Sequence, residues 1–263
     1  MRADRRLLRW IEREVLRCRP IALRYFHSSR LHVERKPDRS PVTAADRAIE
    51  ERLRRAIARA CPGEPIIGEE FGASGRLGAS YWTVDPIDGT RAFSRGLPSW
   101  GVMVGRVEQG RPVLGVVDFP ALGTTIAVAS GVRAYERTGR RTTFLPHPRR
   151  VASLGHAVIF HGGTKWWRST RYAAGFQRAV TSCYLERAYG DCYGYLWALR
   201  GCADVVMDYG VKRWDLVPLA ALAAATGRVL IDCSGRLSFT GPDTIMAAPA
   251  LAQQIATLLR SGS

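Results

Sequence analysis

Two aspartates three residues apart, Asp85 and Asp88, stand in the segment Asp85–Thr90 at the end of an apolar run. Carboxylate and carbonyl oxygens are the ligands that Mg²⁺ takes in proteins, usually together with waters and a substrate phosphate. Gly89 lets the backbone approach a ligand closely, and N–H groups around Thr90 would face a bound phosphate. The segment therefore indicates a site for a metal ion and a phosphate group.

A structural turn is the alternative, because the aspartates of an Asp-Pro turn can also cap backbone N–H groups. Three further acids at the ends of predicted elements favour the metal site: Asp46, Glu69 and Asp215. Each has its own structural explanation. Asp46 would complete a helix capping box, Glu69 would belong to a solvated Glu-Glu pair, and Asp215 would cap the helix that follows it.

Five acids together are harder to explain as separate caps. Carboxylates gathered in a fold repel one another and lose hydration, so the cluster would be costly without a cation. We therefore expect all five to converge around two or three Mg²⁺ ions. The histidines lack the spacing of a zinc site and are expected on the surface or in loops: His27, His32, His147, His156 and His161.

The elements of the first half must bring these acids together. A helical pattern runs from Leu7 to Tyr25, and Pro20 is expected to kink or split it. A second helix follows Thr43 and stops at residues 62–63, which are Pro-Gly. Short strands follow, of which the last three predict an antiparallel meander: 66–67, 81–84, 102–107, 113–117 and 124–128.

Residues 133–150 are polar, basic and rich in turn residues, and we place a domain boundary there, between 1–145 and 146–263. Strands and helices alternate beyond it, which predicts a layered α/β second half. The expected strands are 157–160, 203–207, 229–232 and 244–247, and the expected helices are 168–180, 192–200, 216–226 and 251–260.

Composition limits the class of protein. The chain has 263 residues, 46% of them hydrophobic, so it can bury a sizeable core and disorder is not expected. No apolar run approaches the ~20 residues that cross a bilayer, and the N-terminus lacks a signal-peptide pattern, so we expect a cytoplasmic protein. The six scattered cysteines form no CxxC pair and are expected to be reduced and mostly buried.

The formal net charge of +16 would suit nucleic acid, an anionic membrane or an acidic substrate. All but three of the 39 basic residues are arginines, and they are spread along the whole chain. A nucleic-acid surface more often clusters them with aromatic residues. The pattern favours compositional bias or solubility, so neither nucleic acid nor a membrane is expected as a partner.

Gly68-Glu69-Glu70, Asp85–Thr90 and Trp214-Asp215, in this order and spacing, resemble the signature of the inositol monophosphatase superfamily. Its members are Mg²⁺-dependent, lithium-sensitive phosphomonoesterases, and the resemblance spans about Lys36 to the C-terminus. It implies an α/β (α+β layered) fold, an alternating α-β-α-β-α sandwich, and a homodimer. Residues 1–145 would form an α+β metal-binding domain and residues 146–263 an α/β substrate-binding domain.

The resemblance also implies a metal-binding role for each ligand. Glu69, Asp85 and the Ile87 carbonyl would hold the first ion. Asp85, Asp88 and Asp215 would hold the second.

The catalytic roles follow in the same way. Asp46, with Glu69, would reach a third ion through water. Asp46 and Thr90 would orient the attacking water and help to deprotonate it. Gly89 and Thr90 would donate N–H groups to the phosphate, and Lys36 matches a family lysine near the site.

Within the superfamily the chain is most similar to the histidinol-phosphatase branch, on segments 67–72, 190–195 and 203–212. The non-phosphate part of the substrate would contact Gly190, Asp191, Cys192 and Asp208. An acid at position 208 suits an imidazole or ammonium group, but it equally accepts sugar hydroxyls. Both Asp191 and Asp208 also have a structural alternative, as a helix cap and as an acid that ends a strand.

Three features depart from the branch: Pro20 in the first helix, the segment 161–167 near the expected pocket wall, and Arg213-Trp214 before Asp215. The expected activity is metal-assisted hydrolysis of a small phosphate monoester, L-histidinol phosphate, in histidine biosynthesis. Inositol 1-phosphate, another sugar phosphate or a nucleotide 3′-phosphate is the alternative substrate. A non-enzymatic RNA- or protein-binding module that works through the basic surface is a third alternative, marked by salt-dependent RNA retention.

Overall fold

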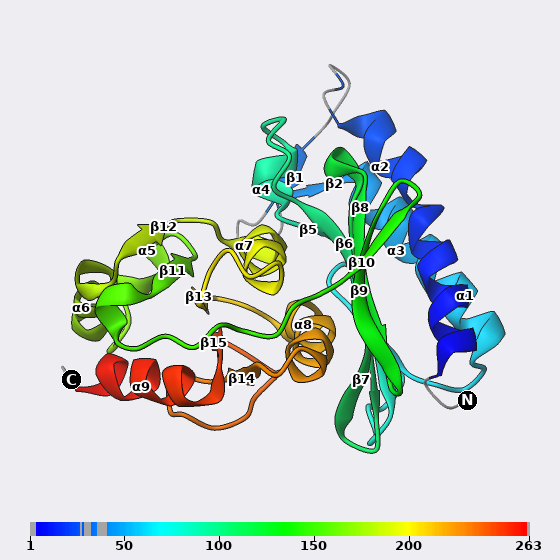
Figure 1. Cartoon of the computed structure of the whole chain (residues 1–263). Helices are drawn as coiled ribbons and strands as arrows, with labels where there is room; N and C mark the ends of the chain where they lie inside the picture. Colours follow the sequence, from blue (N-terminus) through cyan, green and yellow to red (C-terminus); the bar gives the residue numbers. More distant parts are fainter. Residues whose placement is uncertain (1–3, 27, 29–32, 36–40, 262–263) are drawn as a thin grey trace. The chain divides into compact units, whose positions relative to one another are not determined.

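The computed structural model describes residues 4–26, 28, 33–35 and 41–261; Lys36 lies outside the described residues. The chain divides into two compact units, Met1–Phe144 and Leu145–Ser263, each with its own main sheet and hydrophobic core (Figure 1). Helices and sheets form layers in both units, which is the mixed α/β class predicted from the sequence. Among the described helices, none combines the length and apolar character needed to cross a membrane.

The first helical pattern is split as predicted. Helix α1 (Arg5–Leu16) begins at Asp4, whose carboxylate accepts the N–H groups of the next turn at 2.8 and 2.9 Å. Helix α2 (Arg19–Tyr25) follows at once, with Pro20 in its first turn. A proline is tolerated there because the N–H that it lacks has no partner within the helix.

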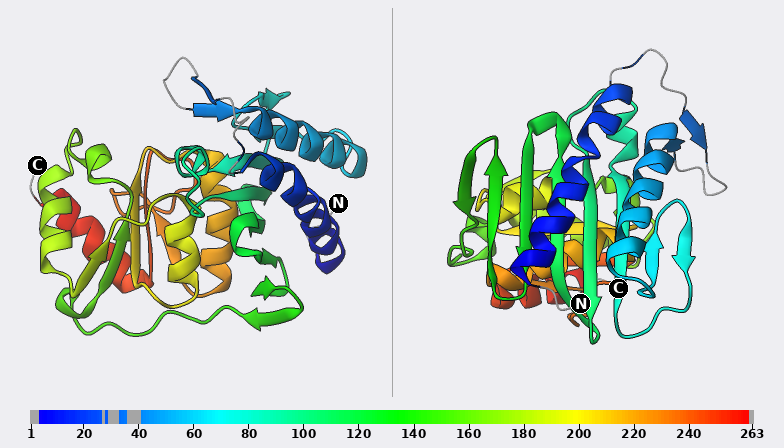
Figure 2. Two further views of the ribbon diagram at one scale, coloured as in Figure 1. Left: turned by 90° about the horizontal axis from the view of Figure 1, so that it is seen from above. Right: turned by 90° about the vertical axis from the view of Figure 1, so that its right-hand side faces the viewer.

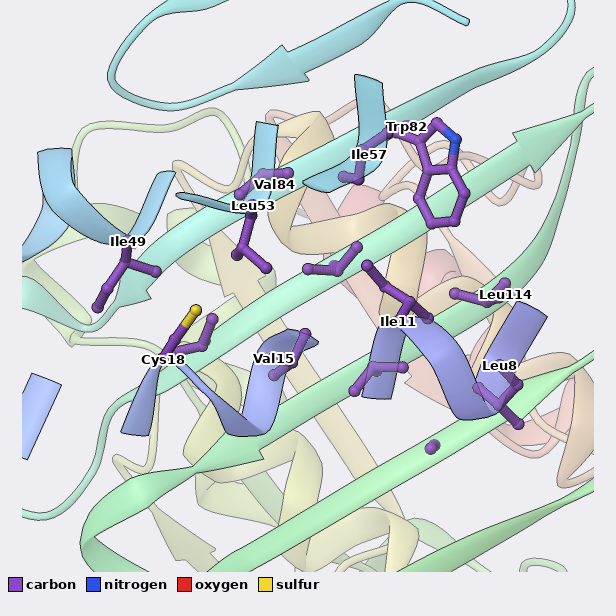
Figure 3. Close-up of a cluster of buried hydrophobic side chains, with 14 of the residues drawn as sticks. Leu8, Ile11, Val15, Cys18, Ile49, Leu53, Ile57, Trp82, Val84 and Leu114 are labelled. Carbon is purple, nitrogen blue, oxygen red and sulfur yellow. The ribbon is translucent and has the colours of Figure 1, made fainter. Parts of the chain in front are cut away.

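Helix α3 (Ala44–Ala60) carries Asp46 into the first unit. Its apolar stripe is fully buried together with that of α1 (Figure 3), and the two helices lie on the same face of the sheet (right view of Figure 2). The stripe residues drawn in Figure 3 are Leu8, Ile11 and Val15 of α1 and Ile49, Leu53 and Ile57 of α3. Because this core fixes the helix against the sheet, it also fixes the acid at the start of α3.

The large sheet of the first unit has eight strands in the order β10-β9-β8-β7-β6-β5-β3-β4. All neighbours are antiparallel except β3 and β5, which are parallel. The strands are β3 (Ile66–Gly68), β4 (Gly72–Ser74), β5 (Tyr81–Asp88), β6 (Gly101–Glu108), β7 (Arg111–Phe119), β8 (Thr124–Ala129), β9 (Val132–Thr138) and β10 (Arg141–Phe144). The smaller elements of this unit are β1 (Val33–Arg35), β2 (Pro41–Thr43), α4 (Thr90–Phe93) and a 3₁₀ turn (Pro120–Leu122).

The predicted meander is confirmed, but the first part of residues 133–150, described from the sequence as turn-rich, consists of paired strands. Residues 132–144 form the hairpin β9–β10 at the edge of the sheet. Its side chains are largely exposed, so the polar and basic composition that suggested a linker is that of an edge hairpin. The chain passes to the second unit directly after Phe144.

The second unit is built on a five-stranded sheet in the order β12-β11-β13-β15-β14. Its strands are β11 (Val158–His161), β12 (Leu185–Arg187), β13 (Val205–Tyr209), β14 (Val229–Ile231) and β15 (Asp243–Ala247). Its helices are α5 (Thr164–Trp167), α6 (Ala173–Ser182), α7 (Asp191–Leu199), α8 (Arg213–Ala225) and α9 (Pro249–Arg260), after a 3₁₀ turn at Leu154–His156. Strands and helices alternate as predicted, with α6 and α9 on one face and α7 and α8 on the other (Figure 1).

Two details of the second unit differ from expectation. The strand β12 was not predicted; it is short and extends the sheet beside β11. His161 was expected on the surface, but it is buried at the end of β11, where one ring nitrogen lies 2.7 Å from a carboxylate oxygen of Glu186. The six cysteines are free thiols, four of them buried, in agreement with the sequence.

A buried ion pair in the first unit gives a test of the fold. Arg106 on β6 is 1% exposed, and its guanidinium donates to both carboxylate oxygens of Glu64 at 2.8 and 3.0 Å. We expect Glu64→Ala to lower the free energy of unfolding by about 2 kcal/mol, because it leaves a buried cation without its main partner. Urea denaturation measures this. Glu108→Ala removes a longer contact of 3.8 Å to the same arginine and should cost far less; equal losses would contradict the assignment.

Candidate metal centre

An irregularity in strand β5 sets the direction of the two aspartates. On β5, Asp85 pairs with Met103 and Asp88 pairs with Gly101, so three steps on β5 match two steps on β6. In a regular strand, residues three apart point to opposite faces, but the extra residue of a bulge brings them to the same side. One carboxylate oxygen of Asp85 and one of Asp88 lie within 4.8 Å of each other.

The residues between the aspartates suit this bulge. Pro86 has no N–H, and a bulge is one of the few places in a sheet where that donor is not required. Ile87 is buried, so its side chain anchors the segment in the core while its carbonyl accepts the Thr90 hydroxyl at 3.0 Å. A carbonyl oxygen has two lone pairs and keeps one for a cation.

Gly89 ends the strand and begins helix α4. Its φ of 87° is left-handed, a conformation that glycine adopts without the steric cost that other residues meet. The turn lets Thr90, which is 8% exposed, fold back so that its hydroxyl also lies 3.5 Å from Asp46 Oδ1. The segment therefore forms a strand-to-helix turn, with the short helix α4 directly after Gly89.

Asp46 completes the capping box with one carboxylate oxygen and directs the other toward Thr90. Its Oδ2 accepts the backbone N–H of Thr43 at 2.8 Å and the Thr43 hydroxyl at 2.5 Å, which completes the predicted capping box. Its Oδ1 is the atom that approaches Thr90. Burial raises the pKa of Asp46 to about 6, against the opposing hydrogen bonds from Thr43, and the charge of Glu69 raises it further.

Glu69 occupies the loop between β3 and β4. It is partly exposed, and its backbone N–H donates to the Val84 carbonyl of β5 at 3.3 Å. Since its charge acts on Asp46, the two carboxylates belong to the same electrostatic environment. The structure therefore gathers Asp46, Glu69, Asp85 and Asp88 at one end of the first unit.

Glu50, the acid that holds this loop, was not predicted from the sequence. Its carboxylate accepts the N–H groups of Glu70 at 2.7 Å and Phe71 at 3.2 Å, and it is fully buried. A signal was present, because Glu50 falls on the apolar stripe of α3 beside Ile49 and Leu53. An acid on the buried face of an amphipathic helix requires partners inside the fold.

In the second unit, Asp215 stands at the third position of α8 and accepts the Lys212 N–H at 2.8 Å. It thus forms a capping-box contact rather than the simple helix cap that the sequence offered as its alternative. The oxygen bound in this way is one of two, so the other can serve as a ligand.

The expected substrate residues of the second unit converge at the carboxyl ends of β11 and β13. A Cβ placed on Gly162 would lie 1.9 Å from Asp208 Oδ1, and one on Gly190 would lie 3.0 Å from the Gly162 Cα. Asp191 is exposed in the first turn of α7, whereas Cys192 is buried. The carboxyl ends of strands are the usual ligand-binding edge of an α/β sheet.

Asp208 has an unusual environment for an acid. It is 6% exposed and accepts the Tyr209 N–H at 2.8 Å. Burial raises its pKa to about 8, and the nearby charge of Asp191 adds to the effect. Such a carboxyl favours a ligand that brings a proton donor or a positive charge.

The donor set of the first unit fits a hard divalent cation. It consists only of carboxylate and carbonyl oxygens, which Mg²⁺ prefers over nitrogen and sulfur ligands. Burial chiefly, and the charge of Glu69 to a smaller extent, raise the pKa of Asp46, and a nearby cation would offset this cost of ionisation.

A consequence for stability follows from Asp46. Its pKa of about 6 in the fold exceeds the ordinary value of 3.8, so its ionisation destabilises the metal-free fold as pH rises from about 4 to above 6. We expect Asp46→Asn to raise the free energy of unfolding in EDTA at pH 7.5 by at most about 3 kcal/mol, and with it the melting temperature. Near pH 4 both quantities should be unchanged. Thermal melts at both pH values measure this. A variant less stable than the wild type at pH 7.5 would contradict it.

A carboxylate-rich end of a layered α/β fold suits a divalent cation with oxygen ligands. The family model described as the inositol monophosphatase family matches residues 7–262, and the chain belongs to this family. The resemblance drawn from the three sequence motifs is thereby confirmed.

Individual relatives are consistent with this assignment. A histidinol-phosphatase of Mycobacterium tuberculosis is 32% identical over 232 residues, covering 88% of this chain and 89% of that protein. A histidinol-phosphatase of Streptomyces coelicolor is 33% identical over 217 residues, covering 80% of each. The structure of an inositol monophosphatase from Zymomonas mobilis is similar with a TM-score of 0.81 and 27% identity, covering 96% of each chain.

Proposed function

We propose that this phosphatase is Mg²⁺-dependent and hydrolyses L-histidinol phosphate to L-histidinol and inorganic phosphate. The observation that carries the metal-dependent chemistry is the bulge of β5, which directs Asp85 and Asp88 to one side of the strand. The choice of substrate is supported by the two histidinol-phosphatases at 32% and 33% identity. It is supported further by the buried acid Asp208, which suits the ammonium or imidazole group of this ester.

The ligand assignment follows the family resemblance. We assign a first ion to Glu69, Asp85 and the Ile87 carbonyl, a second to Asp85, Asp88 and Asp215, and a third, through water, to Asp46 and Glu69. When bound, Mg²⁺ supplies a water of lowered pKa and positive charge beside the phosphoryl oxygens.

The residues of the chain perform the remaining steps. With a pKa of about 6, Asp46 is ionised at neutral pH, so its Oδ1 can take a proton from the attacking water. The Thr90 hydroxyl, 3.5 Å away, orients the same water. We assign phosphate binding to the N–H groups of Gly89 and Thr90.

Substrate recognition falls to the second unit. We assign contacts with the non-phosphate part to Gly190, Asp191, Cys192 and the carboxyl of Asp208. The acid lies against the Gly162 backbone, so its orientation is fixed before a ligand arrives. A fixed carboxyl loses little freedom on binding and therefore discriminates well between substrates.

The test is a panel of phosphate esters, assayed for phosphate release with Mg²⁺ and with EDTA. We expect release from L-histidinol phosphate, the best substrate by kcat/KM, and none in EDTA. The similarity to an inositol monophosphatase makes inositol 1-phosphate the alternative, and a higher kcat/KM for that ester would replace our choice. RNA retention without phosphate release from any ester would overturn the enzyme itself.

Two further parts of the proposal rest on the family resemblance alone. They are a homodimer and a place in histidine biosynthesis; a cytoplasmic location is instead proposed from the sequence pattern. Sedimentation equilibrium of the full chain tests the first. Complementation of a histidine auxotroph that lacks histidinol-phosphatase tests the second.

A further inference from the structure

We propose that Glu50 is a positioning residue for the metal centre, which sets the affinity for Mg²⁺ by holding the loop that carries Glu69. The inference rests on the proposed function, because it assumes that Glu69 is a metal ligand. It goes beyond that function in assigning a role to an acid that contacts neither metal nor substrate.

Every backbone N–H of the loop is fixed. Gly68 pairs with Gly72 at the ends of β3 and β4, so residues 69–71 form the loop between them. The N–H of Glu69 donates to the Val84 carbonyl at 3.3 Å. The other two donate to Glu50: Glu70 to Oε2 at 2.7 Å and Phe71 to Oε1 at 3.2 Å. Glu69 therefore stands between an anchor on β5 and an anchor on α3.

The oxygens of Glu50 are fully engaged in this task. Besides the two loop amides, Oε1 accepts the Nε of Arg54 at 2.7 Å, and Arg54 also donates to the Gly72 carbonyl. The side chain of Glu50 is completely buried. Three donors, one of them the cation Arg54, hold this buried carboxylate on the loop, so we assign Glu50 an action on the metal through the loop.

The contact also explains a glycine of the sequence signature. A Cβ on Gly68 would lie 2.1 Å from Glu50 Oε1, closer than any real contact. The φ of Gly68 is not left-handed, so the position needs glycine for space rather than for conformation. The Glu50 carboxylate fills that space.

Helix α3 thereby couples two parts of the centre. Asp46 and Glu50 are four residues apart, so they lie one above the other on the same face of the helix. Asp46 is directed to Thr90, and Glu50 is directed to the loop of Glu69. The spacing of Asp46 and Glu69 is thus set by one rigid turn of helix.

The experiment is calorimetric titration of Mg²⁺ into the metal-free full-length chain, at a temperature where circular dichroism shows each variant folded. Residues that orient metal ligands typically contribute 10- to 100-fold to affinity. We expect Glu50→Gln to weaken Mg²⁺ binding by roughly that factor, because a neutral amide cannot accept from all three donors. Gly68→Ala should also weaken Mg²⁺ binding. It leaves residue 50 as glutamate, but its added methyl group displaces the Glu50 carboxylate.

Two controls separate positioning from general effects. Glu51→Gln removes the same charge from the next position of α3, where the side chain is exposed and pairs with Arg55 at 3.2 Å. Glu64→Gln weakens a different buried ion pair of the same unit. Both should leave the Mg²⁺ affinity within about twofold of the wild type.

The outcomes are distinct. A folded Glu50→Gln that binds Mg²⁺ as tightly as the wild type overturns the positioning role while leaving the proposed function intact. A wild-type chain that takes up no Mg²⁺ overturns the proposed function first. Should Glu50→Gln fail to fold, Glu50→Asp is tested instead. This variant keeps the charge but moves it away from the loop by the length of one methylene group. An Mg²⁺ affinity equal to that of the wild type would again refute the positioning role.

Discussion

Asp88→Asn is expected to lower phosphate release by at least about 1,000-fold, which corresponds to about 4 kcal/mol of transition-state stabilisation. The bulge of β5 turns this side chain to the same side as Asp85, and one carboxylate oxygen of each residue lies within 4.8 Å of the other. Asparagine keeps the shape but loses the charge that holds a hard cation, and a bound metal is worth several kcal/mol in such a reaction. Steady-state kinetics with saturating Mg²⁺ measure the loss.

The matched control is Asp118→Asn, the same substitution in the same sheet. Asp118 on β7 is fully buried and accepts three hydrogen bonds from Arg19 and one from Thr125, and β6 separates its strand from β5. We expect it to lower the free energy of unfolding by about 2 kcal/mol and to leave kcat almost unchanged. Asp88→Asn should instead lower kcat strongly and leave the free energy of unfolding almost unchanged. Turnover by Asp88→Asn within tenfold of the wild type would remove Asp88 from the centre.

Local patterns of the sequence predicted much of the fold, because each has a local physical cause. The split at Pro20 follows from the missing N–H of proline, and the start of α3 follows from the reciprocal bonds of Thr43 and Asp46. The apolar spacing of Ile49 and Leu53 likewise depends only on the period of the helix. None of these features needs knowledge of a distant segment.

Features that depend on a neighbouring strand were not predictable in the same way. The bulge between Asp85 and Asp88 is a mismatch of register with β6, so it exists only once the two strands pair. The hairpin β9–β10 lies at the sheet edge, where charged and polar side chains replace the apolar alternation that marks a buried strand. Both failures have one cause, since pairing partners are set by the tertiary fold.

The candidate metal centre likewise has residues that the sequence predicted and one that it did not. Asp46, Glu69 and Asp88 stood out because carboxylates at the ends of elements are conspicuous. Glu50 did not, because a Glu-Glu pair in a helix usually indicates a solvated surface. Its exposed neighbour Glu51 fits that reading, whereas Glu50 is enclosed by the loop of Glu69. The helical period places Glu50 on the buried face, but only the packing of α3 against that loop shows which partners it meets.

Asp208→Asn is expected to reduce kcat/KM for L-histidinol phosphate by roughly 100-fold, equivalent to about 2.7 kcal/mol. The proposed partner of this buried carboxyl is a positively charged group, and losing one member of a buried charge pair costs a few kcal/mol. The neutral hydroxyls of inositol 1-phosphate can bond to asparagine as well as to an acid. The same substitution should therefore lower kcat/KM for that ester less than about tenfold.

The pH dependence separates these two modes of recognition. Because its pKa is raised to about 8, Asp208 is mostly protonated at pH 7, and a cationic ligand must displace that proton. Selectivity for L-histidinol phosphate over inositol 1-phosphate should thus rise from pH 7 to about 8.5 and then level off. Taking the ratio of the two esters cancels the pH dependence of the shared chemical step. In Asp208→Asn the ratio should be flat.

The control lies at the other end of the same strand. Asp204, just before β13, is buried too, but its carboxylate accepts from Arg149 at 2.6 Å and from the Val158 N–H at 2.8 Å. Asp204→Asn should lower the melting temperature and leave the selectivity ratio as in the wild type. If Asp208→Asn instead lowers kcat/KM equally for both esters, the acid supports the fold of the site and does not recognise a cation. A cationic substrate would then need another carboxylate. The exposed Asp191 in the first turn of α7 is the candidate, because its charge acts on Asp208 more strongly than that of any other acid.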